Sequence, residues 1–179
     1  MSTITKGNDR SGAIFSDCEK FRYALWRDVY PGDLLGTPRG THGFAAWIGL
    51  NPSTADHEVL DPTTRRCLKW TQEWGCTRYV MLNAFGFRSK DPKVMQAADD
   101  PIGPDNDEIL RNFTRNARFI IAAWGTNCDL IRQEAVCKAV GRTMECLGMN
   151  GDGSPKHPLY VKQDTQRGIF WEPKQEPAK

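Results

Sequence analysis

The apolar and polar positions of the chain alternate between short strand-like runs and helix-like segments. Residues 44–50, 78–85, 118–125 and 143–149 are short, mostly apolar runs, which are typical of strands covered on both faces. Residues 21–29 instead alternate apolar and charged side chains, so we expect a half-buried strand at an edge of the sheet. The glycine and proline residues of the segment 30–43 predict a loop between these strands.

Segments with helical spacing separate the apolar runs. Residues 61–74 open with Asp-Pro, an N-cap followed by proline at the first helical position, and therefore predict a helix. Further helices are expected within residues 91–99 and 103–117 and at about 129–140. Alternating strands and helices imply parallel pairing through right-handed crossovers. We therefore expect an α/β fold, a three-layer α/β/α sandwich with a central, mainly parallel four-stranded sheet and an added N-terminal edge strand.

Length and composition limit the classes of function. A chain of 179 residues that is 39% hydrophobic suits one domain over residues 1–179, and we expect its core at about 44–162 with flexible tails at both ends. The net charge of +2 restricts any nucleic-acid site to a local patch. The six cysteines form no C-x-x-C pair, so we expect no metal and no cofactor. Without a signal-like or membrane-length apolar run, a cytoplasmic monomer without a membrane partner is expected.

Polar residues follow the predicted strands. Asn51-Pro52-Ser53-Thr54 follows the first buried strand, Asn83 lies near the end of the second, and Trp124 to Asn127 follow the third. His157-Pro158 comes after a glycine-rich turn beyond the fourth. Ligands of parallel sheets bind beyond the carboxyl ends of the strands, so these groups are expected on one rim. The alternative is that such residues only cap the helices and turns that follow. Polar residues after all four predicted strands together favour a ligand-binding site.

These four segments resemble the motifs of the uracil-DNA glycosylase superfamily, which occur in the same chain order on a parallel sheet. "GLNPST" (49–54) is similar to the water-activating loop of that superfamily, and "MLNAFGFRS" (81–89) to its base-reading strand. "AAWG" (122–125) and "HPLYV" (157–161) are similar to the third and fourth motifs. The resemblance covers roughly residues 44–162. The chain also resembles an uncharacterised bacterial and phage family marked by "NPSTAD", "DPTxRR" and "HPLY", which implies no activity.

The glycosylase resemblance implies roles for three polar side chains. Cleavage of an N-glycosidic bond needs donors for the departing base, a positioned water and a pocket for a nucleotide held outside its stack. The resemblance implies that Asn51 orients the water, that His157 is a neutral donor to the base, and that Asn83 reads a pyrimidine edge. The alternatives are that His157 caps the turn before Pro158 and that Asn83 bridges two strands. The expected catalytic residues are Asn51 and His157, and the expected base-binding residues are Leu50, Pro52, Ser53, Asn83, Phe85 and Trp124.

Two departures from the superfamily change the expected activity. Asn51 replaces the aspartate of the uracil branch, so a carboxylate near the sugar is missing and slower catalysis is expected. Ser53 replaces a tyrosine that rejects the thymine methyl group, so the pocket should accept a 5-substituted pyrimidine. The usual stacking phenylalanine is also absent, and Phe85, Phe87 or Trp124 would have to stack on the base instead.

Charged and apolar side chains around this rim are candidate contacts to DNA. Arg65 and Arg66 would lie one turn into the helix that begins near Asp61, where they could grip phosphate. The alternative is that Asp61 caps the helix and the arginines pair with it or with Asp56. The expected phosphate and DNA contacts are Thr54, Arg65, Arg66, Lys156, Leu159, Tyr160 and Lys162, and further candidates are Asp56, Asp61 and Asn106. The lysines could equally be solvated, and Leu159 and Tyr160 could pack under their loop.

The leading functional hypothesis is a DNA glycosylase-like enzyme that hydrolyses the N-glycosidic bond of a damaged or 5-modified pyrimidine. Its expected partner is double- or single-stranded DNA with a flipped base. One alternative is a binding protein that holds a flipped base or a nucleotide without cutting it. Another is a hydrolase of free modified nucleosides or nucleotides, which the modest net charge favours. A basic groove across the rim between Asn51 and His157 would favour DNA.

Overall fold

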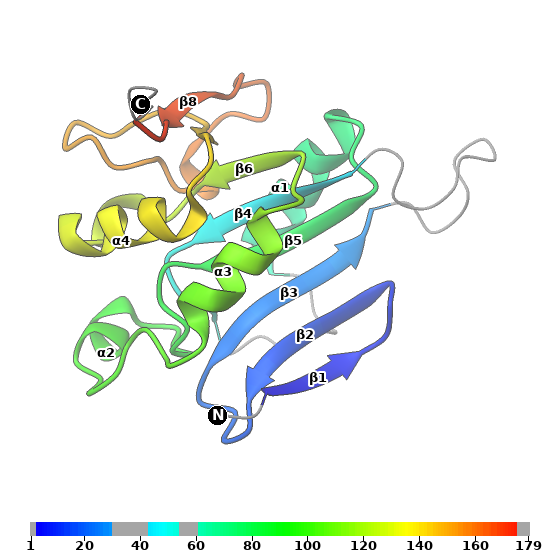
Figure 1. Cartoon of the computed structure of the whole chain (residues 1–179). Helices are drawn as coiled ribbons and strands as arrows, with labels where there is room; N and C mark the ends of the chain where they lie inside the picture. The colour runs from blue at the N-terminus through cyan, green and yellow to red at the C-terminus, as the bar shows by residue number, and fades with distance from the viewer. Residues whose placement is uncertain (1–2, 30–42, 54–60, 175–179) are drawn as a thin grey trace, which may run out of the picture.

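A computed structural model describes residues 3–29, 43–53 and 61–174 of the chain. Eight strands form one mixed sheet in the order β1-β2-β3-β5-β4-β6-β7-β8 (Figure 1). The strands β4, β5, β6 and β7 are parallel to their neighbours within this group, whereas β1, β2, β3 and β8 are added antiparallel. Their bounds are β1 Thr3–Gly7, β2 Ser11–Ser16, β3 Arg22–Asp28, β4 Phe44–Gly49, β5 Arg78–Asn83, β6 Phe119–Ala122, β7 Met144–Cys146 and β8 Gly168–Trp171.

The prediction of a central four-stranded sheet in a three-layer sandwich is wrong, because the sheet is mixed and has eight strands. The strand β3 was expected at an edge, but it pairs with β2 on one side and with β5 on the other. The sequence did not indicate β1, β2 and β8. Strand β1 reads TITKG and is mostly exposed, and half of the residues of β8 are exposed. Backbone pairing rather than a buried apolar stripe defines such strands, so hydrophobic periodicity does not reveal them.

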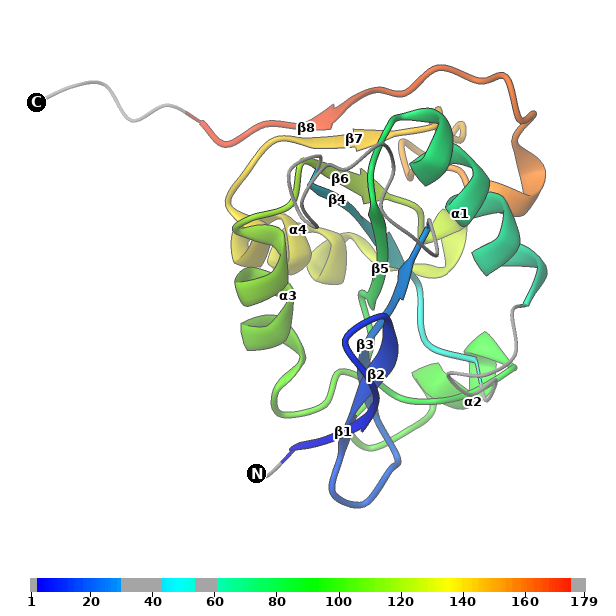
Figure 2. The ribbon, with the colours of Figure 1, turned by 90° about the vertical axis from the view of Figure 1, so that its right-hand side faces the viewer.

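Within the described segments, four α-helices flank the parallel strands: α1 (Pro62–Glu73), α2 (Pro92–Gln96), α3 (Asn106–Thr114) and α4 (Leu130–Val140). Successive side chains of β4 point to opposite faces of the sheet. Trp47 packs with residues of α1 on one face, whereas Ile48 packs with residues of α3 and α4 on the other. Figure 2 shows α1 on one side of the sheet and α3 and α4 on the opposite side.

Three tryptophans anchor α1 on the sheet. The indole of Trp47 on β4 lies 5.9 Å from that of Trp70 and 5.3 Å from that of Trp74, measured between ring centroids. Trp47 Nε1 also donates a hydrogen bond of 2.9 Å to Thr71 Oγ1. Because the helix is held at its middle and its end, its N-terminus is positioned beside the carboxyl ends of β4 and β5.

The start of α1 agrees with its prediction from Asp-Pro. The carboxylate of Asp61 accepts a hydrogen bond of 2.7 Å from the backbone N–H of Thr64, and Pro62 is the first helical residue.

All six cysteines are free, and every one except Cys18 is buried. In the described segments, no three histidine, cysteine or acidic side chains form a group that could hold a metal ion. Within the same segments, no helix is long and apolar enough to cross a membrane.

Candidate functional site

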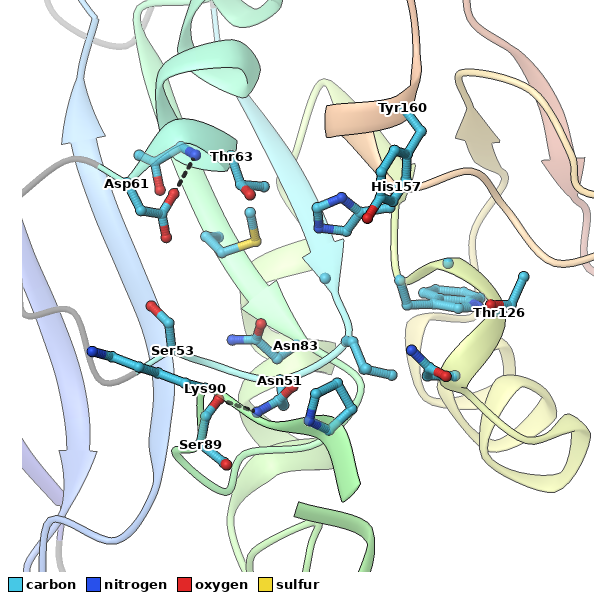
Figure 3. A pocket seen from close by; sticks show the side chains of 18 of the residues that line it. Asn51, Ser53, Asp61, Thr63, Asn83, Ser89, Lys90, Thr126, His157 and Tyr160 are labelled. Atoms are coloured by element: carbon cyan, nitrogen blue, oxygen red, sulfur yellow. Dashed lines mark hydrogen bonds between the residues drawn. The ribbon is translucent and has the colours of Figure 1, made fainter. Parts of the chain in front are cut away.

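A cavity of about 420 Å³ lies at the carboxyl ends of β4 and β5 (Figure 3). Its walls come from the loop after β4, the end of β5 with the loop that follows, the turn after β6, the start of α1 and the loop that carries His157. Asn51 and His157, which are more than a hundred positions apart in the chain, line this same cavity. The volume falls in the usual range of small-molecule sites.

The floor of the cavity carries a buried amide. Asn83, the last residue of β5, is 3% exposed, and its Nδ2 has no hydrogen-bond partner among the described residues. A buried donor without a partner costs about 1–3 kcal/mol, so such a group is typical of a position that a ligand completes. Glycine at position 49 avoids a close contact with this amide, because a Cβ atom there would lie 3.1 Å from Asn83 Oδ1.

The backbone beneath Asn83 is held by another buried amide. Asn106 Nδ2, at the start of α3, donates hydrogen bonds of 3.0 Å to the carbonyl oxygen of Asn83 and 3.2 Å to that of Ala84. Asn106 is 1% exposed and does not line the cavity. It therefore supports the end of β5 rather than contacting a ligand.

The side chain of Asn51 connects the loops that follow β4 and β5. Its Nδ2 donates a hydrogen bond of 2.9 Å to the carbonyl oxygen of Ser89 and lies 3.4 Å from those of Phe87 and Pro52. Carbonyl oxygens can only accept, and of the two ends of the amide only the NH₂ group donates, so these contacts determine which way the amide is oriented. The Asn51 carboxamide oxygen is then the atom left to accept a hydrogen bond from a water or a ligand.

His157 enters the cavity from the loop that ends in a short 3₁₀ turn, Pro158–Tyr160. Burial lowers the pKa of its imidazole below the ordinary value, and the carboxylate of Asp61 opposes part of that shift. Its Nδ1 accepts a hydrogen bond of 3.4 Å from the backbone N–H of Leu159. A neutral imidazole whose Nδ1 accepts carries its proton on Nε2, so His157 is suited to donate a hydrogen bond.

Helix α1 holds the loop of His157 in place. The guanidinium of Arg66 donates from Nε to the carbonyl oxygen of Pro158 at 3.0 Å and from a second nitrogen to the carbonyl oxygen of Val161. Further along the helix, Trp70 Nε1 donates a hydrogen bond of 2.7 Å to the carbonyl oxygen of Gln163. Arg66 therefore binds the protein's own backbone, whereas the sequence suggested a phosphate contact or an ion pair.

The structure brings together some of the other predicted site residues and separates the rest. Leu50, Ser53, Trp124, Tyr160 and Asp61 line the cavity, whereas Pro52 and Phe85 are buried outside it. The Phe85 ring lies in the core, with the Arg132 guanidinium 5.8 Å from its centroid, so it is not placed to stack on a ligand. Arg65, Lys156, Leu159 and Lys162 are exposed and do not line the cavity. Thr54 and Asp56 lie outside the described residues.

Two cationic side chains of the cavity were not predicted. Arg22, at the start of β3, is 5% exposed and lines the cavity, and the exposed Lys90 lines it from the loop after β5. The alternating pattern of residues 21–29 predicted a half-buried strand at an edge of the sheet, and such a pattern does not indicate a buried arginine. Lys90 follows residues 81–89, the segment that resembles the base-reading strand of the glycosylases, and nothing in the sequence around it indicated a site residue.

Comparisons with known proteins identify a family. Residues 22–159 match the model of a family described as a protein of unknown function, DUF1643. The matched range includes β3, the loop of Asn51, the end of β5 and His157, and so contains most of the cavity. Searches of curated proteins and of solved structures found no match.

Proposed function

The chain belongs to the DUF1643 family, and we propose that it hydrolyses the N-glycosidic bond of a damaged or 5-modified pyrimidine nucleotide, as a DNA glycosylase does. One observation carries the proposal. The buried Nδ2 of Asn83, which has no described partner, and the imidazole of His157 line one cavity at the carboxyl ends of the parallel strands. This arrangement supplies donors to a flat polar ligand that enters between them.

Asn83 is the proposed reader of the base. Its Nδ2 would donate to a carbonyl oxygen of the pyrimidine, and its Oδ1 would accept from a ring N–H. Because the side chain is 3% exposed, a base that reached it would lose its contact with water along that edge. A base with a different arrangement of donors and acceptors would leave the buried amide of Asn83 without hydrogen bonds. The free-energy cost of these missing hydrogen bonds would strongly favour the matching base.

His157 is the proposed donor to the leaving base. When the bond between the sugar and the base breaks, its electron pair stays with the base, and negative charge gathers on a carbonyl oxygen. A neutral imidazole with its proton on Nε2 stabilises that oxygen more in the transition state than in the ground state. The pKa of His157, lowered by burial, supports the neutral form near pH 7.

Asn51 is the proposed ligand of the attacking water. Hydrogen bonds to three carbonyl oxygens hold its Nδ2, so its Oδ1 is oriented before substrate arrives. Ser53 lines the same cavity and is small, which supports room for a substituent at the 5-position of the base. The roles of Asn51, Asn83 and His157 come from the resemblance to the uracil-DNA glycosylase superfamily, and the shared cavity supports them.

A hydrolase of free modified nucleosides or nucleotides is the second candidate, and a specific observation favours it. The predicted phosphate contacts do not converge on the cavity, because Arg66 binds the backbone of the His157 loop and Arg65, Lys156 and Lys162 do not line the cavity wall. A non-cleaving protein that only holds a base would have the same cavity. Both alternatives predict results that differ from those of a DNA glycosylase.

The deciding experiment offers the full chain two kinds of substrate. Single- and double-stranded oligonucleotides containing uracil, thymine or 5-hydroxymethyluracil are assayed for abasic sites, and the matching nucleosides and monophosphates for released base. We expect base release by the wild type and its loss in His157→Ala, with no change in Lys138→Ala, a control on the exposed side of α4 away from the cavity. Turnover of mononucleotides alone would assign the second candidate, and binding without release would assign a non-cleaving protein.

A further inference from the structure

We propose that Asp61 is the catalytic carboxylate of this site, an inference that rests on the proposed N-glycosidic hydrolysis. The position that holds an aspartate in the uracil branch holds Asn51 here, so the reaction needs its negative charge from elsewhere. Among the described residues that line the cavity, Asp61 is the only carboxylate. It comes from the start of α1, ten positions further along the chain.

The capping geometry of Asp61 leaves half of its carboxylate available. One oxygen accepts the hydrogen bond of 2.7 Å from the Thr64 N–H, as N-cap residues do. Figure 3 shows the other oxygen directed toward the side where Ser53 and Asn83 lie, with Asp61 and His157 on opposite sides of the cavity and Asn83 below both in this view. A ligand that contacts both Asn83 and His157 would therefore occupy the cavity that this carboxylate also lines.

The arginines of α1 do not neutralise Asp61. Within the described residues, neither Arg65 nor Arg66 forms an ion pair with Asp61, although their spacing suggested one. Arg66 donates instead to the carbonyl oxygens of Pro158 and Val161. The field of the carboxylate does reach His157, where it raises the pKa of the imidazole against the effect of burial. The negative charge of Asp61 is thus felt inside the cavity.

The negative charge of the Asp61 carboxylate has two roles in the proposed reaction. As the bond between C1′ and the base nitrogen lengthens, its electron pair moves to the base and positive charge grows on the sugar, which an adjacent carboxylate stabilises. A water oxygen then forms the new bond to C1′, and Asp61 accepts the proton that this water releases. The base leaves as an anion and takes a proton from solvent, the sugar carries the new hydroxyl group, and Asp61 returns its proton to solvent.

A charge-neutral variant tests the role of Asp61 without removing the helix cap. Asparagine caps helices about as well as aspartate, so Asp61→Asn keeps the hydrogen bond to Thr64. We expect base release at saturating substrate to fall by about 100- to 10,000-fold, with the Kd for substrate within about threefold of the wild type and an unchanged Tm. The matched control is Asp129→Asn, because Asp129 caps α4 through the N–H of Arg132 but does not line the cavity.

Two further readouts distinguish a catalytic carboxylate from a structural one. Asp61→Ser also keeps a cap but opens space, so added formate should restore part of its base release while leaving the wild type unchanged. The pKa of His157, followed by NMR, should fall in Asp61→Asn and stay constant in Asp129→Asn. Wild-type rates in both Asp61 variants would overturn the role of Asp61 alone, whereas absence of base release by the wild type would overturn the proposed function with it.

Discussion

Arg66 Nε donates a hydrogen bond of 3.0 Å to the carbonyl oxygen of Pro158, the residue that follows His157. The two residues are separated by 92 positions in the chain. A second nitrogen of the same guanidinium donates to Val161, and the indole of Trp70 lies 5.2 Å from the guanidinium carbon. Helix α1, whose N-cap is Asp61, therefore sets the position of His157, the proposed donor to the leaving base.

Arg66→Met should loosen the loop of His157. The change removes two hydrogen bonds from a charged donor to backbone carbonyl oxygens but keeps an apolar stem beside Trp70. We expect the free energy of unfolding to fall by about 2 kcal/mol and base release to fall by about tenfold or more. Urea unfolding and single-turnover kinetics measure the two effects.

Arg65→Met is the matched control, because Arg65 is the exposed neighbour of Arg66 on the same helix. Its free energy of unfolding should stay within about 0.5 kcal/mol of the wild type. Equal losses in the two variants would show that the contact between Arg66 and Pro158 does not position His157.

Asn106→Ala should destabilise the protein through the end of β5. The buried carbonyl oxygen of Asn83 would lose the donor Asn106 Nδ2, that of Ala84 would keep only its hydrogen bond from Arg132 Nε, and a small cavity would form. We expect a loss of about 2–3 kcal/mol in the free energy of unfolding. Asn112→Ala, on the exposed side of the same helix, should change it by less than about 0.5 kcal/mol, and similar losses in both would contradict the assignment.

Asn83→Ala should alter base preference more than it weakens the binding of a nucleic acid, because phosphate contacts carry most of the affinity. Asn83→Asp should be more severe for a ligand that presents a carbonyl oxygen, since it exchanges the buried donor Nδ2 for an acceptor. Competition between oligonucleotides that differ in one base measures the preference. Unchanged preference in both variants would count against Asn83 as the reader of the base.

The pH dependence of stability should reveal the buried imidazole of His157. Its pKa is lowered in the folded protein, so the unfolded chain binds a proton at a pH where the folded chain does not. This contribution to stability is complete above the ordinary pKa of 6.5 and is lost as the pH falls through the lowered value. The charged or titratable side chains that share the cavity with it are Asp61, Tyr160, Arg22 and Lys90.

We expect the wild type to lose more free energy of unfolding than His157→Gln between about pH 7.5 and about pH 5. Urea unfolding at several pH values measures the difference, in which the contributions of all other groups cancel. Parallel curves for the two proteins would show that the imidazole is not held in its neutral form.

Some parts of the fold could be predicted because the signal is local. Asp61-Pro62 predicted the start of α1, and the apolar runs predicted β4, β5, β6 and β7, because capping and burial act on neighbouring residues. The outer strands β1 and β8 carry no such local signal, because β1 is mostly exposed and half of the residues of β8 are exposed. Strand β2 is mostly buried, but it is a short segment whose place in the sheet depends on its pairing with β3. This is why the predicted sheet had too few strands and the wrong edge.

The sequence by itself determined which polar residues end the parallel strands, and it indicated that Asn51, Asn83 and His157 belong together. Only the tertiary structure decided what each neighbouring group does. Arg66, which was predicted to contact phosphate, instead donates to the backbone of the His157 loop. Asp61, the N-cap of α1, also lines the cavity. The physical reason is that residue order specifies local conformation, whereas the partner of a long, charged side chain depends on which distant backbone the packing of α1 brings within its reach.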